Sequence, residues 1–438
     1  MEILFNPVVV SVIFLCIMCI YRINVLLAII ISAITAGLCA GMPINKIMQT
    51  FISGMGGNSE TALSYILLGA FAAAMTHTGL APILAMKIAN IIKGKAFLLI
   101  TIITVIAMMS QNLIPVHIAF IPILIPPLLH VMNQLKIDRR AIACALAFGL
   151  KTPYITIPAG FGLIFQGLIA DNLSLNGINV QVSEIWKSNW FLGLAMLTGL
   201  LIAVLITYRK PREYKDIQIA GMNNEISDKD NLKFTKSHYL TLLAAFATLG
   251  VQLWTNSLPL GALVGLGVIF GTGAIDHRKM DKLMNEGIGL MGYVAFVMLI
   301  AAGFALVLKE TGSIDSLVHS AAVFMQGSKL LAVTIMLAIG LFITMGIGTS
   351  FGTIPILAVL FVPICIKMGF STPATIILLS SAAALGDAGS PASDTTLGPT
   401  AGLNADGQHN HITDTCIPTF LHYNIPLIIF AVLAVYIF

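Results

Sequence analysis

Three ionisable residues stand inside apolar stretches that glycine and proline interrupt. Asp387 and Asp394 lie in the segment 384–396, which reads ALGDAGSPASDTT, and Lys151 opens the segment 151–160, KTPYITIPAG. A charge in an apolar interior is costly and usually serves a function. We interpret Asp387 and Asp394 as acceptors of a sodium ion or a proton, and Lys151 as their counter-ion or as the partner of a substrate carboxylate. A purely structural Lys–Asp pair is the alternative.

A second pair of interruptions lies at 111–117, QNLIPVH, and at 344–353, TMGIGTSFGT. Glycine and proline open a helix and free backbone groups, which at membrane depth must be bonded within the protein or line a cavity. Freed carbonyls and hydroxyls can replace the water shell of a sodium ion, and freed amides attract an anion. Each segment bisects an apolar stretch, so we expect a re-entrant hairpin or a tight turn. Kinks or small-residue packing are the alternative.

One further cluster could hold a metal ion. His409, His411, Asp414 and Cys416 are zinc-ligating residue types, but their close spacing matches no standard zinc site. We therefore predict a polar loop packed under the membrane part of the protein. The six cysteines are scattered through the chain and imply no disulfide framework.

The elements that must position these residues are apolar helices. Of the 438 residues, 58% are hydrophobic and only 10% are charged, and the mean hydropathy is +0.95. A soluble domain needs roughly a quarter of its residues charged, and uncharged runs of about 20 residues can cross a bilayer. The composition predicts an all-α polytopic protein of the cell inner membrane, with the lipid bilayer as partner. The net charge of +4 comes mostly from loops, and we expect no nucleic-acid partner.

An internal duplication orders the helices. A gapless offset of 233 residues aligns the two halves, placing Gly54 on Gly287, Pro122 on Pro355 and Pro158 on Pro391. We expect a first repeat over 1–208, a polar cytoplasmic linker over 209–237 and a second repeat over 238–438. The stretch 209–236 holds seven basic and five acidic residues, which places it inside by the positive-inside rule. The basic loops then change sides between the copies, which predicts inverted topology.

The segment from Gly386 to Thr396 resembles the S-P-x-S-D-T-T signature of NhaC-type sodium/proton antiporters. The continuation through 403–416 and 422–426 is more similar to the YuiF branch of that family. The resemblance implies the ion-transporter-superfamily fold, with re-entrant hairpins, broken helices, an elevator-like transport domain and a homodimer. It also implies that the branch carries amino acids, histidine in particular. Carried over by position, it places the site at Thr349, Ser350, Thr353, Ser390, Ser393, Asp394 and Thr395, with Asn112, Thr152 and Thr156 opposite.

Lysine in one break and aspartate in the other offer both signs of charge, which suits a zwitterion. The sequence therefore predicts a secondary transporter of a small solute, an amino acid such as histidine, coupled to Na⁺ or H⁺. A sodium/proton antiporter without organic substrate is the alternative. A channel would need a continuous polar pore. An intramembrane enzyme would need a nucleophile–base pair or a metal motif; the sequence has neither, so we expect no enzymatic activity and no cofactor beyond the coupling ion.

Overall fold

The computed structural model describes residues 5–21, 23–78, 96–112, 117–215, 217, 235–255, 257–314, 316–317, 319–320, 328–347, 349–391 and 393–438. Every regular element within these residues is a helix. The prediction of an all-α protein is therefore confirmed.

The helices of the first half precede the polar stretch that follows Tyr208. They are α1 (Pro7–Ile20), α2 (Val25–Cys39), α3 (Ile44–Met55), η2 (Gly56–Asn58), α4 (Ser59–His77), α6 (Ala96–Asn112), α7 (His117–Gln134), α8 (Arg139–Thr156), α9 (Phe161–Leu175), α10 (Val182–Ile202) and η3 (Ala203–Thr207).

The helices of the second half begin at Lys236. They are α11 (Lys236–Thr255), α12 (Leu258–Gly271), η4 (His277–Lys279), α13 (Met280–Glu310), α15 (Lys329–Ile347), α16 (Ser350–Lys367), α17 (Thr372–Ala384), α18 (Asp394–Leu403), η5 (His411–Cys416), α19 (Ile417–Thr419), η6 (Phe420–Asn424) and α20 (Ile425–Ile437).

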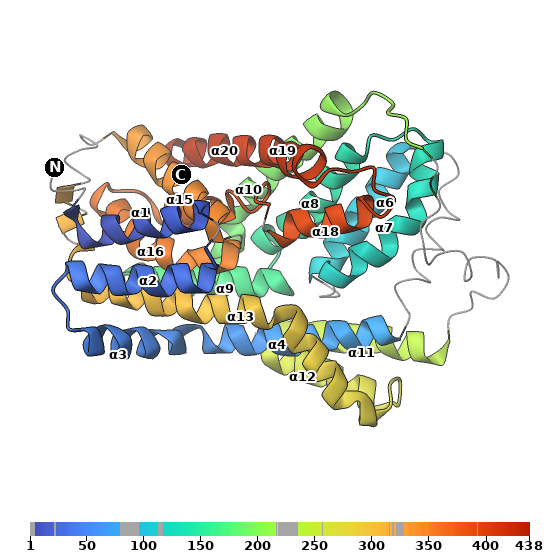
Figure 1. Cartoon of the computed structure of the whole chain (residues 1–438), viewed down its shortest axis with the longest axis horizontal. Helices are drawn as coiled ribbons and strands as arrows, with labels where there is room; N and C mark the ends of the chain where they lie inside the picture. Colours follow the sequence, from blue (N-terminus) through green and yellow to red (C-terminus); the bar gives the residue numbers. More distant parts are fainter. Residues whose placement is uncertain are drawn as a thin grey trace.

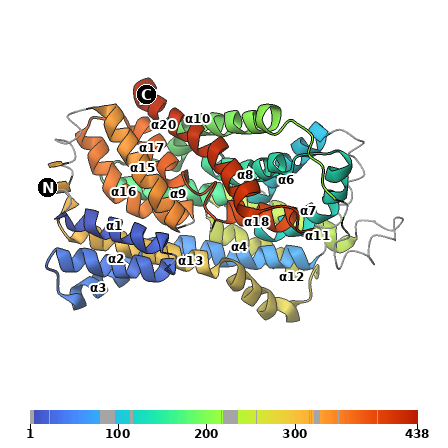
Figure 2. The ribbon, with the colours of Figure 1, turned by 45° about the horizontal axis from the view of Figure 1, so that its top comes forward.

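Several described helices are long and apolar enough to cross a bilayer. Four single helices meet this criterion among the described residues: Val182–Thr207, Met291–Glu310, Ser350–Lys367 and His411–Ile437. Helices α8 and α9 are long and apolar enough only when they are taken together as one span, and this span bends by 47° at a short break. In Figure 1 the helices α1, α2, α3, α15 and α16 lie toward one end of the long axis, whereas α6, α7 and α18 lie toward the other. Figure 2 shows the same separation after a turn of 45°.

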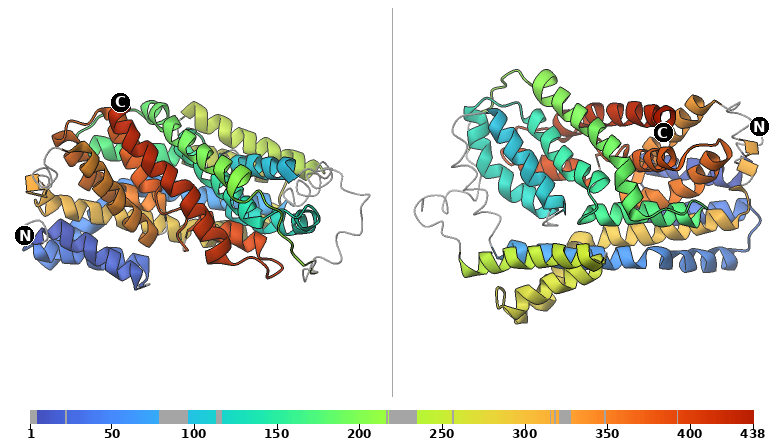
Figure 3. Two further views of the ribbon diagram at one scale, coloured as in Figure 1. Left: turned by 90° about the horizontal axis from the view of Figure 1, so that it is seen from above. Right: turned by 180° about the vertical axis from the view of Figure 1, so that it is seen from behind.

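Helix α13 packs along α3 and α4, as the right view in Figure 3 shows. The packing depends on glycine. A Cβ on Gly54 would lie 2.9 Å from the Cα of Gly303, and one on Gly287 would lie 2.2 Å from the nitrogen of Ala70. Because Gly54 meets Gly303 while Ala70 meets Gly287, α13 runs antiparallel to α3 and α4. Small residues allow such close backbone approach between helices in a membrane.

The starts of several helices recur at a constant separation along the chain. Val25, Ala96 and His117 open α2, α6 and α7, and Leu258, Lys329 and Ser350, each 233 residues later, open α12, α15 and α16. A packing contact recurs as well: a Cβ on Gly149 would lie 2.4 Å from Cβ of Ala107, and one on Gly340 would lie 2.7 Å from Cβ of Ala382. The same two positions thus touch in both halves, with the glycine on opposite partners.

Candidate functional site

The helix break predicted at 384–396 is confirmed. Helix α17 ends at Ala384 and α18 begins at Asp394. Gly386 and Gly389 adopt φ values of +83° and +126°, which are open to glycine at little cost. The side chain of Asn424 bridges the turn, since its Oδ1 accepts from the Gly386 amide at 3.3 Å and its Nδ2 donates to the Ala388 carbonyl at 3.2 Å. Freed backbone groups inside the protein thus find a partner.

Asp387 lies in this break with its side chain buried and held by hydroxyl groups. Its Oδ2 accepts from the hydroxyls of Tyr154 at 2.8 Å and Ser350 at 2.9 Å, and its Oδ1 accepts from Ser393. The hydroxyl of Thr395 donates to the backbone carbonyl of Asp387 at 2.8 Å. Hydrogen bonds to an ionised acceptor are the strong ones, so the arrangement stabilises a carboxylate away from water.

Two helix N-termini meet at this carboxylate. Ser350 is the first residue of α16, with Thr349 as its half-buried N-cap, and Ser393 is the N-cap of α18, accepting from the Thr395 amide at 3.2 Å. The positive ends of two helix dipoles therefore lie near the negative charge, which favours it. The break predicted at 344–353 exists but is shorter, since α15 runs to Ile347 and α16 begins at Ser350, and it supplies one of these two N-termini.

Lys151 is fully buried on α8, and its ammonium group donates to the carbonyl of Ala384, the last residue of α17. Among the described residues no ion pair joins Lys151 to Asp387 or Asp394. An ammonium group carries three hydrogens, and the Ala384 bond accounts for one.

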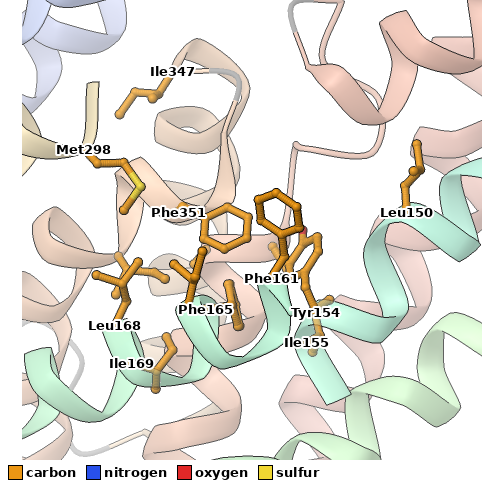
Figure 4. Packing of buried hydrophobic residues seen from close by; sticks show 14 of the residues in the cluster. Leu150, Tyr154, Ile155, Phe161, Phe165, Leu168, Ile169, Met298, Ile347 and Phe351 are labelled. Carbon is orange, nitrogen blue, oxygen red and sulfur yellow. The ribbon is translucent and has the colours of Figure 1, made fainter. Parts of the chain in front are cut away.

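A cluster of buried aromatic rings packs around Tyr154, whose hydroxyl donates to Asp387; Figure 4 shows Tyr154, Phe161, Phe165 and Phe351. The ring of Tyr154 lies 5.1 Å, centroid to centroid, from both Phe165 and Phe351, and Tyr65 lies 5.5 Å from Phe161 and 5.8 Å from Phe351. These separations are typical of attractive ring pairs. The cluster fixes the ring of Tyr154 and shields Asp387 from one side.

The prediction for the first-half break needs correction. Helix α8 continues through Lys151, Thr152 and Pro153 to Thr156, and the break covers only 157–160. Pro153 has no N–H and so removes one helical hydrogen bond, yet the helix continues past it. At its end the hydroxyl of Thr156 donates to the Thr152 carbonyl at 2.7 Å. The Thr152 hydroxyl is buried and has no hydrogen-bond partner among the residues that the structure describes.

The remaining predicted residues lie around the site without touching Asp387. The hydroxyl of Thr353 donates to the Ser350 carbonyl at 2.8 Å, and that of Ser390 donates to the Met345 carbonyl at 3.0 Å. Asp394 is half-buried as the first residue of α18, and no described side chain donates to its carboxylate. The side chain of Asn112, at the end of α6, lies outside the described residues.

The histidine cluster was predicted to be a loop, and this needs correction: His409 precedes η5, whereas His411, Asp414 and Cys416 lie within that helical turn. His409 Nε2 lies 2.7 Å from Thr415 Oγ1, and His411 Nδ1 lies 2.7 Å from Thr400 Oγ1. Nε2 of His411 lies 3.0 Å from the Pro391 carbonyl. In the described part of the chain, no three His, Cys, Asp or Glu side chains converge as metal ligands would.

Tyr154 is the functional residue that sequence reasoning missed. It carries no charge and follows a proline within an otherwise apolar stretch, so its residue type alone does not mark it as a site residue. One signal was present: Tyr154 lies 233 residues before Asp387, the same offset as the duplication. Lys151 and Ala384 are separated by the same number. Applying the offset residue by residue would have placed Tyr154 opposite the aspartate.

The described helices and candidate spans define an all-helical, multi-pass membrane protein with a broken helix pair. Two solved structures share the fold: MtrF of Neisseria gonorrhoeae, assigned to a class of antimetabolite efflux pumps, and the YdaH transporter of Alcanivorax borkumensis. The TM-score is 0.60 for both, at 15% and 13% identity, over 90% of this chain and 85% and 88% of theirs.

The chain belongs to the Na⁺/H⁺ antiporter family, whose model matches residues 145–434, and a second Na⁺-H⁺ antiporter family model matches residues 6–92. It is 47% identical to an uncharacterised membrane protein of Vibrio parahaemolyticus, over 98% of this chain and 99% of that one. It is 45% identical to the "Putative amino acid transporter YuiF" of Bacillus subtilis, with the same coverage. The protein is therefore a multi-pass membrane transporter with bacterial relatives and not an enzyme, and the family resemblance seen in the sequence is confirmed.

Proposed function

We propose that the protein carries an amino acid, histidine or one like it, coupled to Na⁺ or H⁺. The observation that carries this proposal is the pair of buried, opposite and mutually unpaired charges of Lys151 and Asp387. Buried charges are normally paired, because removing an ion from water costs several kcal/mol. A zwitterion supplies both missing partners, with its carboxylate at Lys151 and its ammonium group at Asp387. The "Putative amino acid transporter YuiF" supports the same class of solute.

The charges also account for a coupling ion. Asp387 and Asp394 are separated by seven positions, and with Lys151 they give the site one net negative charge. A zwitterion leaves that charge unchanged, whereas one Na⁺ or H⁺ neutralises it. Moving a neutral assembly through the membrane avoids the cost of an unpaired charge in a medium of low dielectric constant. The hydroxyls of Ser350, Ser393 and Thr395, with Thr349 and Thr353 behind them, are ligands of the type that sodium accepts.

The alternative is exchange of sodium for protons without an organic solute, and the half-buried carboxylate of Asp394 near Asp387 favours it. Uptake of the radiolabelled common amino acids into proteoliposomes, with and without a sodium gradient, separates the two. We expect uptake of at least one amino acid, lost in Asp387→Asn and reduced in Asp394→Asn. The exposed Glu213 provides a matched control as Glu213→Gln. Sodium–proton exchange with no amino-acid uptake, or full activity in both aspartate variants, would contradict the proposal.

We propose further that residues 1–208 and 238–438 form an inverted repeat joined by a cytoplasmic linker at 209–237. Reciprocal contacts support it: Gly54 meets Gly303, and their equivalents Gly287 and Ala70 meet each other. Reciprocal contacts are the mark of a two-fold axis, and antiparallel equivalents imply inversion. Lys46 and Lys279 are equivalent, so membrane-impermeant thiol reagents should label Lys46→Cys from outside and Lys279→Cys from inside. Labelling of both from one side would refute inversion.

The family resemblance leads us to propose re-entrant hairpins at α6–α7 and α15–α16, and a homodimer working by an elevator motion. In that motion the helices that hold Asp387 would move against α3, α4 and α13. Cross-linking of α13 to α16 at successive positions should trap two registers. A single register under all solute and ion conditions would argue against an elevator.

A further inference from the structure

A cavity of about 230 Å³ opens beside the outer ends of α9 and α13, apart from the Asp387 site. Helices α3 and α13 form one wall, and α9 and α16 form the other. Its polar lining residues come from α3, η2, α9, α13 and the turn that follows α9; they are Ser53, Asn58, Asp171, Asn172, Asn176 and Lys309. With the linker in the cytoplasm, this end of the molecule faces outside.

Three of these residues present hydrogen-bond acceptors to the cavity. The Nδ2 groups of Asn58, Asn172 and Asn176 donate to the backbone carbonyls of Met298, Leu168 and Asn172 at 3.1, 2.9 and 2.8 Å. A carbonyl oxygen cannot donate, so each amide must turn its nitrogen to that carbonyl and its Oδ1 away. No donor within the described residues reaches these three oxygens, although Asn58 is only 5% exposed and Asn172 only 6%. Together with the Asp171 carboxylate they form a wall that suits an ammonium group.

Lys309 supplies the opposite charge. Its ammonium group donates to the carbonyl of Leu175 at 3.1 Å, which holds the side chain across the mouth of the cavity. One hydrogen bond leaves two N–H groups of the ammonium for other acceptors, and a carboxylate fits them. The cavity thus offers acceptors on one side and a cation on the other, in a volume below the usual range of sites for drug-sized ligands.

Apolar side chains separate this cavity from Asp387. Along α9, Phe161 and Phe165 pack on Tyr154 and Phe351, Leu168 follows one turn later, and Asp171 lies in the cavity (Figure 4). A solute in the cavity therefore cannot touch Asp387 until these side chains move. One wall includes α16, whose first residue Ser350 donates to Asp387. In the proposed elevator motion the helices that hold Asp387 move against α3 and α13, so the two walls of the cavity should move relative to each other.

We propose that this cavity is a second, outer binding site for a zwitterionic amino acid, with the ammonium group against Asp171 and the asparagine oxygens and the carboxylate against Lys309. The solute class rests on the proposed function, but the site is tested separately from transport. Ser53 lines the cavity and is exposed, so Ser53→Cys in a Cys39→Ser background offers a thiol for an impermeant cationic methanethiosulfonate reagent. The Cys39→Ser parent gives background labelling.

We expect at least one of the twenty common L-amino acids to slow labelling of Ser53→Cys about tenfold, and its methyl ester to protect less. Asp387→Asn should abolish uptake and keep this protection. Asp171→Asn or Lys309→Gln should remove it, whereas the matched controls Glu310→Gln and Lys46→Gln should not. For each variant, the labelling rate without solute is divided by the labelling rate with solute. This ratio is needed because Asp171→Asn removes a negative charge and so also weakens the attraction of the cationic reagent to the cavity.

Each remaining outcome is decisive. Protection without any transport would keep the outer site and refute the proposed function. Transport without protection at any solute concentration would refute the outer site and keep the function. Equal protection by sodium chloride alone would assign the cavity to a cation and overturn the zwitterion. Loss of protection in Asp387→Asn would place the solute at the inner site only. Thermal melting of each variant in detergent identifies any that fails to fold.

Discussion

Replacing Tyr154 by phenylalanine tests whether the hydroxyl network holds Asp387. The substitution keeps the ring contacts with Phe165 and Phe351 and removes one of four hydroxyls that donate to the carboxylate. Tyr154 is 1% exposed, so water cannot replace the lost donor. A hydrogen bond to a charged group contributes about 1.5–3 kcal/mol, and a neutral one about 0.5–1.5 kcal/mol. We therefore expect Tyr154→Phe to lower the free energy of unfolding by about 2 kcal/mol.

A double-mutant cycle measures how much of this loss depends on the negative charge of Asp387. In an Asp387→Asn background the acceptor is a neutral amide oxygen, so Tyr154→Phe should cost about 1 kcal/mol there, leaving a coupling of about 1 kcal/mol. Reversible unfolding of the four proteins by SDS in mixed micelles, followed by far-ultraviolet circular dichroism, measures each free energy. A cost below about 0.5 kcal/mol in the wild type, or equal costs in both backgrounds, would show that the tyrosine does not support the carboxylate.

Three further predictions concern stability. Gly287→Ala drives a Cβ to 2.2 Å from the Ala70 nitrogen and should cost about 1–3 kcal/mol, while Gly289→Ala, with nothing within 4 Å, should be tolerated; thermal melting compares them. Asp406→Asn removes the charged partner of the buried guanidinium of Arg139 and should lower the free energy of unfolding by about 3 kcal/mol, seen in the same assay. Burial lowers the pKa of His409 to about 4, so the folded protein resists protonation and loses about 3 kcal/mol as pH falls from about 6.5 to 4. A pH series should show this loss, and His409→Gln should reduce it.

Much of the fold was predictable because it depends on composition and on the positions at which glycine and proline interrupt the apolar stretches. The apolar runs, the break at 384–396 and the aspartate within it follow from rules that act locally. The length of the break in α8 was not predictable in the same way. Pro153 signals an interruption, yet the helix continues to Thr156, because packing on neighbouring helices outweighs one lost hydrogen bond.

Partners across the molecule were the least predictable part of the site. The sequence predicts that Lys151 is the counter-ion of the aspartates or the partner of a substrate carboxylate, and it gives no sign of the bond observed, to the carbonyl of Ala384. That carbonyl is free only because α17 ends at Ala384, so the bond depends on where another helix stops. The outer cavity was equally hard to predict. Its residues Asn58, Asp171 and Lys309 are far apart along the chain, and none belongs to a recognisable motif.

The proposed two-fold axis explains why the copies had to diverge at the site. Tyr154 touches its equivalent Asp387, and Lys151 touches its equivalent Ala384. Residues that touch their own equivalents lie at the axis, where identical copies would set aspartate against aspartate or lysine against lysine. Like charges in a buried site repel strongly. Tyr154→Asp alone should therefore be among the most destabilising changes at this position, and adding Asp387→Tyr should recover part of the loss by restoring a donor opposite a carboxylate. Equal melting temperatures for the single and double variants would contradict an axis through this pair.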